Sequence, residues 1–342
     1  MTGEEAIRIA IETIGEGKPG DYILSPSGHA TGFREKAPDL AGILGSSDIA
    51  SLARQYETHD RDALAAQKKF RRIFNLANAC VFLTGIFITL VLATAIVFPD
   101  QGSKYPLLFL SLGGVITGGL ASMYLFMMKH GKYLEEWMTL RAKAETTRLN
   151  FFSNVIKTPA SPGNGSVIPV ELLKLEYFRR FQLDVQRTYY SCRGSAHRAR
   201  AEKILFWSAL SVAGAAISSG AAGVLGVLSP KFAAIAAAGT VFAGIGTFFA
   251  MREAVNQDRR NAERYRRTWQ FLEELSSRLD QVRKAVFSGG MKPLEEFAGA
   301  VNEQLSLEHR QWMEELNEAG SAFGRLETTL KEYSEKITPK QG

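Results

Sequence analysis

The sequence predicts an all-α membrane protein with four transmembrane helices, arranged as two hairpins and extended by cytoplasmic amphipathic and coiled-coil-like helices. The first observation is that four windows, 73–98, 105–128, 204–230 and 232–251, contain no Asp, Glu, Lys, Arg or His. Each is long enough to cross a hydrocarbon core of roughly 30 Å as a helix, which takes about 20 residues. The second is that the connections within each pair, Pro99–Lys104 and Ser229–Lys231, are short. This sorting of charges excludes a single soluble globular domain.

Lys and Arg residues predict the orientation of the spans. Basic residues stand before the first span, throughout 129–203 and after the fourth span, whereas the two outer connections carry only Lys104 and Lys231. The positive-inside rule then places the N-terminus, the middle segment and the C-terminus in the cytoplasm. The first 60 residues show no cleavable signal peptide, so the first hairpin is expected to direct insertion. The net charge of +6 is explained by topology and contact with the lipid bilayer, and no nucleic-acid partner is expected.

Composition shifts divide the chain into five parts. We expect a cytoplasmic N-terminal arm (1–46), a first two-transmembrane unit (47–157), a linker (158–168), a second two-transmembrane unit (169–318) and a C-terminal tail (319–342). Residues 3–14 form a short amphipathic helix in this scheme. Residues 15–47 are rich in Gly, Pro and Ser and are expected to be an irregular arm or small hairpin. The tail is expected to be weakly helical.

Helices are also expected beside the spans. One should continue from the second span to about Phe152, and another should run from about Val170 into the third span. Beyond the fourth span, apolar residues recur at coiled-coil-like spacing until Ser288-Gly289-Gly290. A further amphipathic helix follows and offers a complementary apolar face. The residues expected to couple these two helices are Trp269, Leu272, Leu275, Leu279, Phe297, Val301, Leu305 and Trp312.

The order of basic helix, hairpin and amphipathic helix occurs twice, with both hairpins entering and leaving on the same side. This indicates a parallel repeat, related by an axis along the membrane normal.

Small residues in the spans allow close helix packing. They repeat every four residues at Gly114, Gly118 and Ser122, and again at Gly214, Ser218, Ala222 and Gly226. One interpretation is packing within a single four-helix bundle. The other is that the second hairpin packs against copies of itself and lines a central path with the hydroxyls of Ser208, Ser211, Ser218, Thr240 and Thr247.

The sequence contains no recognisable enzyme, cofactor or metal signature. His29, His59, His130, His197 and His309 lack metal-ligand spacing, and no phosphate-binding or nucleophile motif occurs. Cys80 and Cys192 are expected to be free thiols, and Arg141 with Glu145 a salt bridge on a helix face. We therefore expect no catalytic, cofactor-binding or metal residue and no enzyme activity.

Two stretches resemble the SLATT family, the SMODS- and SLOG-associating two-transmembrane effector domains. In the first, Tyr56 and the run Gln67-Lys68-Lys69-Phe70-Arg71-Arg72 lead into a hairpin that is followed by Trp137, Arg141, Ala144-Glu145 and Arg148. In the second, Asn261-Ala262-Glu263-Arg264-Tyr265 precedes Trp269, Leu272-Glu273 and Leu275, and Gln304-Leu305-Ser306-Leu307-Glu308-His309-Arg310-Gln311-Trp312 follows. The resemblance covers roughly residues 50–320 and fits tandem copies on one chain.

The resemblance implies a homo-oligomeric, pore-forming or membrane-disrupting effector of a bacterial antiviral conflict system that acts by abortive infection. It carries over no catalytic residue. The nucleotide-binding sensor domains that usually accompany this family are absent, so a nucleotide second messenger or a sensor protein would have to act on the helices themselves. The alternatives are a membrane scaffold that recruits soluble partners through its cytoplasmic helices, and a small-solute channel or transporter. The absence of ionisable residues inside the spans argues against an ion-coupled transporter.

Overall fold

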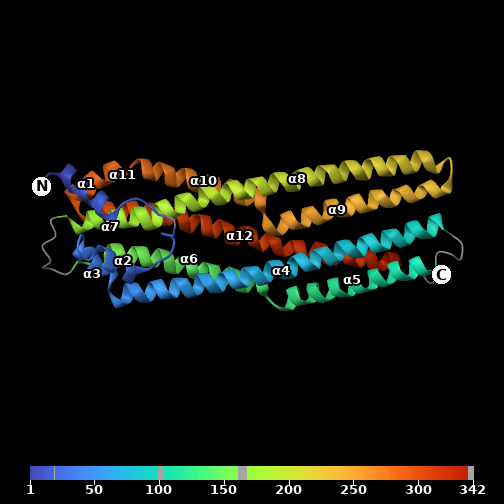
Figure 1. Ribbon diagram of the computed structural model, residues 1–342, viewed down its shortest axis with the longest axis horizontal. Helices are drawn as coiled ribbons and strands as arrows, with labels where there is room; N and C mark the ends of the chain where they lie inside the picture. Colours follow the sequence, from blue (N-terminus) through green and yellow to red (C-terminus); the bar gives the residue numbers. More distant parts are fainter. Residues whose placement is uncertain (19, 99–103, 161–167, 338–342) are drawn as a thin grey trace. The chain divides into compact units, whose positions relative to one another are not determined.

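The computed structural model describes residues 1–18, 20–98, 104–160 and 168–337, which form helices and contain no strand (Figure 1). Within these residues, four helices are long and apolar enough to cross a membrane. The helices are α1 Gly3–Ile14, α2 Pro26–Phe33, α3 Pro38–Leu44, α4 Ser47–Val97, α5 Lys104–His130, α6 Tyr133–Lys157, α7 Val170–Phe178, a π-helix at Arg179–Asp184, α8 Val185–Gly226, a 3-10 helix at Pro230–Ala234, α9 Ile235–Asn256, α10 Asp258–Ser277, α11 Leu279–Gly289 and α12 Met291–Ile337. The chain is therefore an all-α membrane protein.

Two compact units interleave along the sequence. We call the first the head (Met1–Ala65, Glu135–Ala196 and Asn261–Met313) and the second the span unit (Ala66–Leu134, His197–Arg260 and the chain from Glu314). These units do not follow the expected boundaries at 47–157 and 169–318. The reason is that helices from both halves of the chain share the core of the head, so the sequence repeat is not a pair of separate domains.

The N-terminal residues form part of the head core, and the expectation of an irregular arm is wrong. Helices α2 and α3 each begin at a proline, which is well suited to the first turn of a helix. Leu40 and Leu44 of α3 are fully buried in the same core as Ile14 of α1 and Phe151 of α6. The prolines therefore mark helix starts, not an absence of structure.

Buried cations hold the ends of two helices in the head. Lys174 of α7 is fully buried, and its Nζ donates to the carbonyl oxygens of Ile156 and Thr158, each at 2.7 Å, where α6 ends. Arg179 donates to the carbonyl oxygen of Gly15 at 2.8 Å, just past the end of α1. These contacts satisfy carbonyl groups that have no partner within their own helix.

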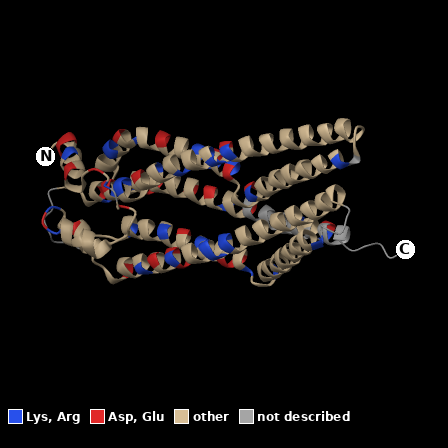
Figure 2. Cartoon of the chain, turned by 45° about the vertical axis from the view of Figure 1, so that its right-hand side comes forward, with Lys and Arg blue, Asp and Glu red and all other residues tan. Residues whose placement is uncertain are grey.

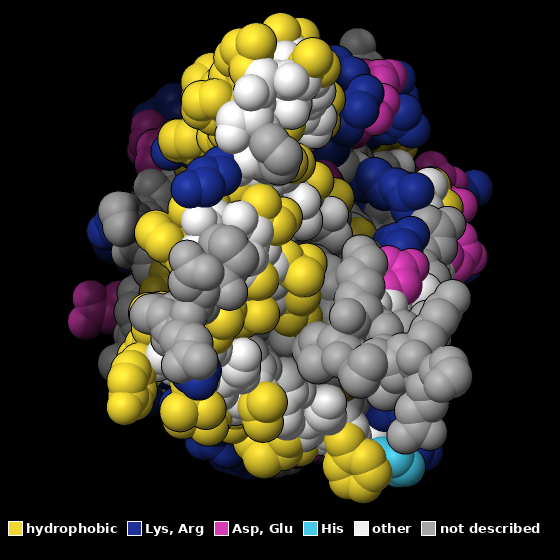
Figure 3. Space-filling model, turned by 90° about the vertical axis from the view of Figure 1, so that its right-hand side faces the viewer, with side chains coloured by type: hydrophobic (Ala, Val, Ile, Leu, Met, Phe, Trp, Pro, Cys, Tyr) yellow, Lys and Arg dark blue, Asp and Glu magenta, His cyan; other side chains and the backbone are white. Residues whose placement is uncertain are grey.

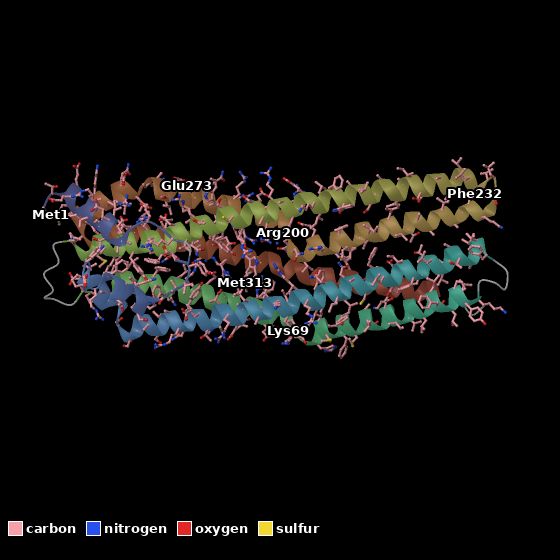
Figure 4. The ribbon with its side chains drawn as sticks, in the orientation of Figure 1. Met1, Lys69, Arg200, Phe232, Glu273 and Met313 are labelled. Atoms are coloured by element: carbon pink, nitrogen blue, oxygen red, sulfur yellow. The ribbon has the colours of Figure 1, made fainter. Side chains whose placement is uncertain are left out.

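The four spans lie side by side in the order α8, α9, α4 and α5 (Figure 1). Thr84 of α4 donates to Thr117 of α5 at 3.0 Å, and Asn78 of α4 donates to the carbonyl oxygen of Phe248 in α9 at 3.2 Å. Charged residues are almost absent from the spanning parts of these helices (Figure 2). Lys69 and Arg200 lie at one end of the span unit and Phe232 at the other (Figure 4). Seen from the Phe232 end, hydrophobic side chains cover much of the outer surface (Figure 3). The expected connection at 99–103 lies outside the described residues.

The second span of each hairpin ends at a break in the helix. The first span of each hairpin belongs to a long helix, α4 or α8. The expected helix from about Val170 into the third span is confirmed, apart from the short π-helix. By contrast, α5 ends at His130 and α6 begins at Tyr133, so the expected continuous helix after the second span is wrong. Gln257 separates α9 from α10 in the same way. Shared placement of these breaks agrees with a parallel repeat.

The last helix is longer than expected. The amphipathic helix after Gly290 is confirmed, but α12 runs to Ile337, so the chain does not change to a weakly helical tail at residue 319. Residues 338–342 of that expected tail, like residues 161–167 of the expected linker, lie outside the described residues. The segment from Glu314 belongs to the span unit and not to the head.

Candidate functional site

Charged and aromatic side chains from five helices come together in the head. Four of these helices carry the residues on which the family resemblance depends, and the structure brings the two sets together. We call this group the charged cluster; it consists of Tyr56 and Asp60 on α4, Arg141, Glu145 and Arg148 on α6, Tyr189 and Tyr190 on α8, Arg264 and Tyr265 on α10, and Glu308 and His309 on α12.

The α6 side of the charged cluster is an alternating row of charges. Arg141, Glu145 and Arg148 follow one another at spacings of four and three, which places them on one helix face. Arg141 Nη1 lies 2.9 Å from Asp60 Oδ1, and Arg148 Nη2 lies 2.7 Å from Glu145 Oε2. Arg141 also pairs with Glu145. The expected Arg141–Glu145 bridge exists, but it belongs to a network shared with α4 and is not a solvated pair on one helix.

Electrostatics distinguishes the two glutamates of the charged cluster. Burial opposes the ionisation of Glu145, but the charges of Arg148 and Arg141 outweigh it and lower its pKa to about 2. Burial dominates at Glu308 and raises its pKa, although Arg264 acts in the opposite sense. Glu145 is therefore a firmly ionised anion between two cations, whereas Glu308 is the carboxylate that is more easily protonated.

Glu308 connects three helices. Tyr190 Oη of α8 donates to Glu308 Oε2 at 3.0 Å, and Arg264 Nε of α10 donates to Glu308 Oε1 at 3.0 Å. Because the acceptor stands on α12, one carboxylate fixes α8 and α10 against the last helix. Burial raises the pKa of Tyr190, so its hydroxyl stays protonated and remains a donor.

Aromatic rings enclose these charges. Tyr190 and Tyr265 meet edge to face with ring centroids 5.2 Å apart, and Trp137 meets Trp312 in the same way at 5.3 Å. His309 stacks on Trp312 at 5.6 Å. Burial lowers the pKa of His309, and its Nε2 atom has no hydrogen-bond partner among the described residues.

The charged cluster joins helices through paired charges. Its charges are paired with one another and bridge helices, and within the described residues no group of three or more His, Cys, Asp or Glu side chains is placed to hold a metal ion. Charges buried in this way hold one arrangement firmly, because breaking a single pair leaves an uncompensated charge. The charged cluster is therefore suited to hold its five helices in one arrangement.

The coupling residues expected from the sequence lie in the head core. Leu272, Leu275 and Leu279 are buried together with Phe297, Val301 and Leu305, and Trp269 packs against the same core. Trp312 is half-buried and contacts Trp137 instead. The two apolar stripes therefore occupy the common core of one chain, as their complementary patterns indicate.

The expected small-residue ridges face neighbouring spans of the same chain. A Cβ atom on Gly214 would lie 2.8 Å from the Phe242 ring of α9, and Gly114 and Gly118 face Phe87 and Thr84 of α4. Ser218 faces Gly239 and Ser211 faces Gly246, both on α9. At the remaining positions, Ala222 is buried, Ser208 is half-buried, and a Cβ atom on Gly226 would meet nothing within 4 Å.

The expected hydroxyl groups do not meet in one path within a single chain. Ser211 and Ser218 lie between α8 and α9, whereas Ser122, Thr240 and Thr247 are exposed. The three exposed hydroxyls donate to carbonyl oxygens one turn earlier in their own helices, those of Gly118, Ala236 and Ala243. Any path lined by Thr240 and Thr247 would need a second copy of the chain.

Sequence reasoning missed three members of the charged cluster, Asp60, Tyr189 and Tyr190. Arg141, Glu145 and Arg148 alternate with the buried residues Trp137, Ala144 and Phe151 on α6, and charges placed between core positions signal a buried network. No comparable signal marks the tyrosines, because aromatic residues beside a span are common anchors. Comparison of the chain with family models, with curated proteins and with solved structures gave no match.

Proposed function

We propose that this chain is a homo-oligomeric, membrane-permeabilising effector of a bacterial antiviral conflict system, and that it is not an enzyme. It would reside in the inner membrane with both termini in the cytoplasm. A rearrangement of the head would open a polar path through the membrane and arrest or kill the infected cell.

One observation carries this proposal: the charged cluster is built on helices that also form spans. Tyr56 stands on α4 and Tyr190 on α8, and both helices extend to the far ends of their spans. A rigid helix transmits a displacement at one end to the other, so release of the cluster would act directly on the first and third spans. A protein that only anchors itself in the membrane does not need a charged network on the helices that form its spans.

The trigger is proposed to act on the head. The resemblance of residues 50–320 to SLATT domains supports a nucleotide second messenger, or a sensor protein that responds to one.

Oligomers are proposed to form through the outer face of the second hairpin. Small residues on α8 are exposed at spacings of four and three, on the face opposite α9: Ala209, Ala213, Ala216, Gly220 and Gly223. A second exposed row lies on α9 and includes two hydroxyls: Ala236, Thr240, Ala243, Thr247 and Ala250. Packing of copies through the α8 row would leave the α9 row to line a path.

This surface yields a prediction with an internal control. Gly220→Leu and Gly223→Leu place bulk where nothing lies within 4 Å in one chain, so the monomer should tolerate them while crosslinked oligomers disappear or change size. Gly214→Leu should instead disturb the α8–α9 hairpin, because Phe242 occupies the space. Crosslinking in isolated membranes separates the two effects. Unchanged oligomers in both Gly220 and Gly223 variants would contradict this interface.

The proposed topology is tested by reporter fusions. Because Lys and Arg gather at one end of every span, reporters after Gly102 and Ser229 should be extracytoplasmic, and a reporter at Gly165 should be cytoplasmic. Paired alkaline phosphatase and fluorescent-protein fusions give opposite signals at each site. An extracytoplasmic Gly165 would contradict the orientation.

The structure weighs against recruitment of partners through the coiled-coil-like stripe. Leu272, Leu275 and Leu279 are buried in the head core, so this stripe is not available to a soluble partner without opening the head. A small-solute transporter would need a path lined by polar groups within the spans, and the hydroxyls of Ser211, Thr240 and Thr247 do not meet in one path within a single chain.

The decisive experiment measures membrane potential and growth after induced expression, with and without phage. An effector should collapse the potential only when triggered, and Gly220→Leu should abolish the collapse at equal protein level. A chain that leaves the potential intact under infection would contradict the proposal. Purified protein in dye-loaded vesicles then shows whether the chain acts alone.

A further inference from the structure

Two non-glycine residues in the described part of the chain have left-handed backbone conformations. Lys132 has φ 48° and Gln257 has φ 50°. Lys132 follows α5 and Gln257 follows α9, so each stands where the second span of a hairpin has ended. The first spans have no such break, because α4 and α8 continue as helices past the ends of their spans.

The break at Gln257 is not dictated by the local sequence. Residues 251–277 contain neither Gly nor Pro, the residues that usually end helices. A side chain with a Cβ atom disfavours the left-handed conformation, so this segment on its own would prefer a continuous helix. The polar contacts around Gln257 therefore help to hold the break.

The contacts at the break are polar and lie within the span unit; those to Glu253 are local, and those to Asp258 come from α8. The Gln257 N–H donates to the Glu253 carbonyl oxygen at 2.7 Å, and the Arg259 N–H donates to Glu253 Oε1 at 2.9 Å. Asp258, the first residue of α10, is buried, and its Oδ1 lies 2.6 Å from Nδ1 of the buried His197 on α8. Arg200 Nε lies 3.6 Å from the same carboxylate. The start of α10 is thereby tied to the third span's helix.

We infer that Gln257 is a two-state joint, at which α9 and α10 either break, as here, or fuse into one continuous helix, and that the His197–Asp258 pair holds the broken state. The local preference for helix and the contact between α8 and Asp258 act in opposite directions, as in a switching element. A role for the joint in opening the membrane path rests on the proposed function. The existence of its two states does not rest on it.

The test compares substitutions with opposite preferences at residue 257. Gln257→Gly removes the Cβ and favours the break, whereas Gln257→Val introduces a β-branched side chain that disfavours it. Asp258→Asn keeps the side-chain size but removes the charge that pairs with His197. At Glu263, an exposed helical position of α10, Gly should weaken the helix more than Val does, so Glu263→Gly and Glu263→Val form the matched control.

Spin labels on the exposed Thr247 and Arg267 report the state of the joint in a background carrying Cys80→Ser and Cys192→Ser. A continuous helix of this length spans about 30 Å, so the population near 30 Å reports the continuous state. Gln257→Gly removes the cost of a left-handed side chain and should lower the population near 30 Å by roughly 5- to 30-fold. Gln257→Val and Asp258→Asn should raise that population.

The full-length protein in dye-loaded vesicles supplies the second readout. If the joint controls the path, Gln257→Val and Gln257→Gly should change dye release in opposite directions relative to wild type, and the Glu263 variants should not. Identical distance distributions in all Gln257 and Asp258 variants would overturn the joint. Altered distances with unchanged dye release would overturn its role in gating, whereas dye release at the level of protein-free vesicles from every variant, wild type included, would count against the proposed function and leave the distance result standing.

Discussion

Glu145→Gln is expected to lower the free energy of unfolding by about 3–5 kcal/mol, the cost of removing one partner from a buried ion pair. Glu145 stands between Arg141 and Arg148, and the Arg148 side chain is only 6% exposed, so the substitution leaves a buried guanidinium without its anion. Thermal unfolding of the purified protein in detergent, followed by circular dichroism, measures the change. We expect the midpoint to fall by roughly 10 °C or more.

Glu263→Gln is the matched control. Glu263 and Arg267 form a glutamate–arginine pair four residues apart, as Arg141 and Glu145 do, but both side chains are more than half exposed. Exposed pairs contribute about 0–1 kcal/mol, so this variant should unfold close to the wild-type midpoint. Equal shifts in the two variants would show that the charged cluster holds the head no more firmly than a surface pair.

The same carboxylate predicts a pH dependence. The pKa of Glu145 is lowered from 4.5 to about 2, so its contribution to stability is complete above pH 4.5 and is lost as the pH falls toward 2. This shift corresponds to roughly 3 kcal/mol. Glu308 has a raised pKa, and its contribution changes above pH 4.5, outside this window. Glu145→Gln should therefore show a smaller loss of stability between pH 4.5 and pH 2 than wild type, and parallel pH profiles would contradict the assignment.

Trp312→Ala is expected to uncouple the head from the membrane. Trp312 contacts Trp137 edge to face and stacks on His309, and replacing a packed tryptophan by alanine costs about 3 kcal/mol. The variant should insert normally, because the spans are unchanged. Dye uptake per inserted molecule, with and without phage, should either disappear or become independent of infection.

A double-mutant cycle makes this result specific. Trp137→Ala and Trp312→Ala should together cost less than the sum of the single variants by about 0.5–1.5 kcal/mol, the coupling of an aromatic pair. Phe271→Ala, at a partly exposed position of α10, controls for loss of an aromatic side chain. A wild-type uptake ratio in Trp312→Ala at normal abundance would remove the head from the mechanism.

The sequence alone determined the parts of this protein that depend on local composition. Four windows without charge predict the four spans, and short connections pair them into hairpins, because the cost of charge in hydrocarbon acts at each residue separately. Helical spacing likewise identified the apolar faces that include Leu272 and Val301, now found in one core. The sequence also contains a signal for one of the N-terminal helices, because Ala37, Leu40, Ala41 and Leu44 follow helical spacing.

Tertiary structure alone decided the rest. The charged cluster joins residues that lie far apart in the chain, such as Tyr56, Arg141 and Glu308. Nothing in the local sequence around each residue indicates that the three lie close together in space. A small residue in a span indicates that another helix packs closely against it, but the sequence does not say which helix. Only the structure shows that Gly214 faces Phe242 of α9. Gln257 is the clearest case: no Gly or Pro stands near it, and the helix breaks where a histidine sixty residues earlier contacts the carboxylate that follows it. The preference of a residue for helix amounts to a free energy of about 1 kcal/mol, and a few buried polar contacts can outweigh it.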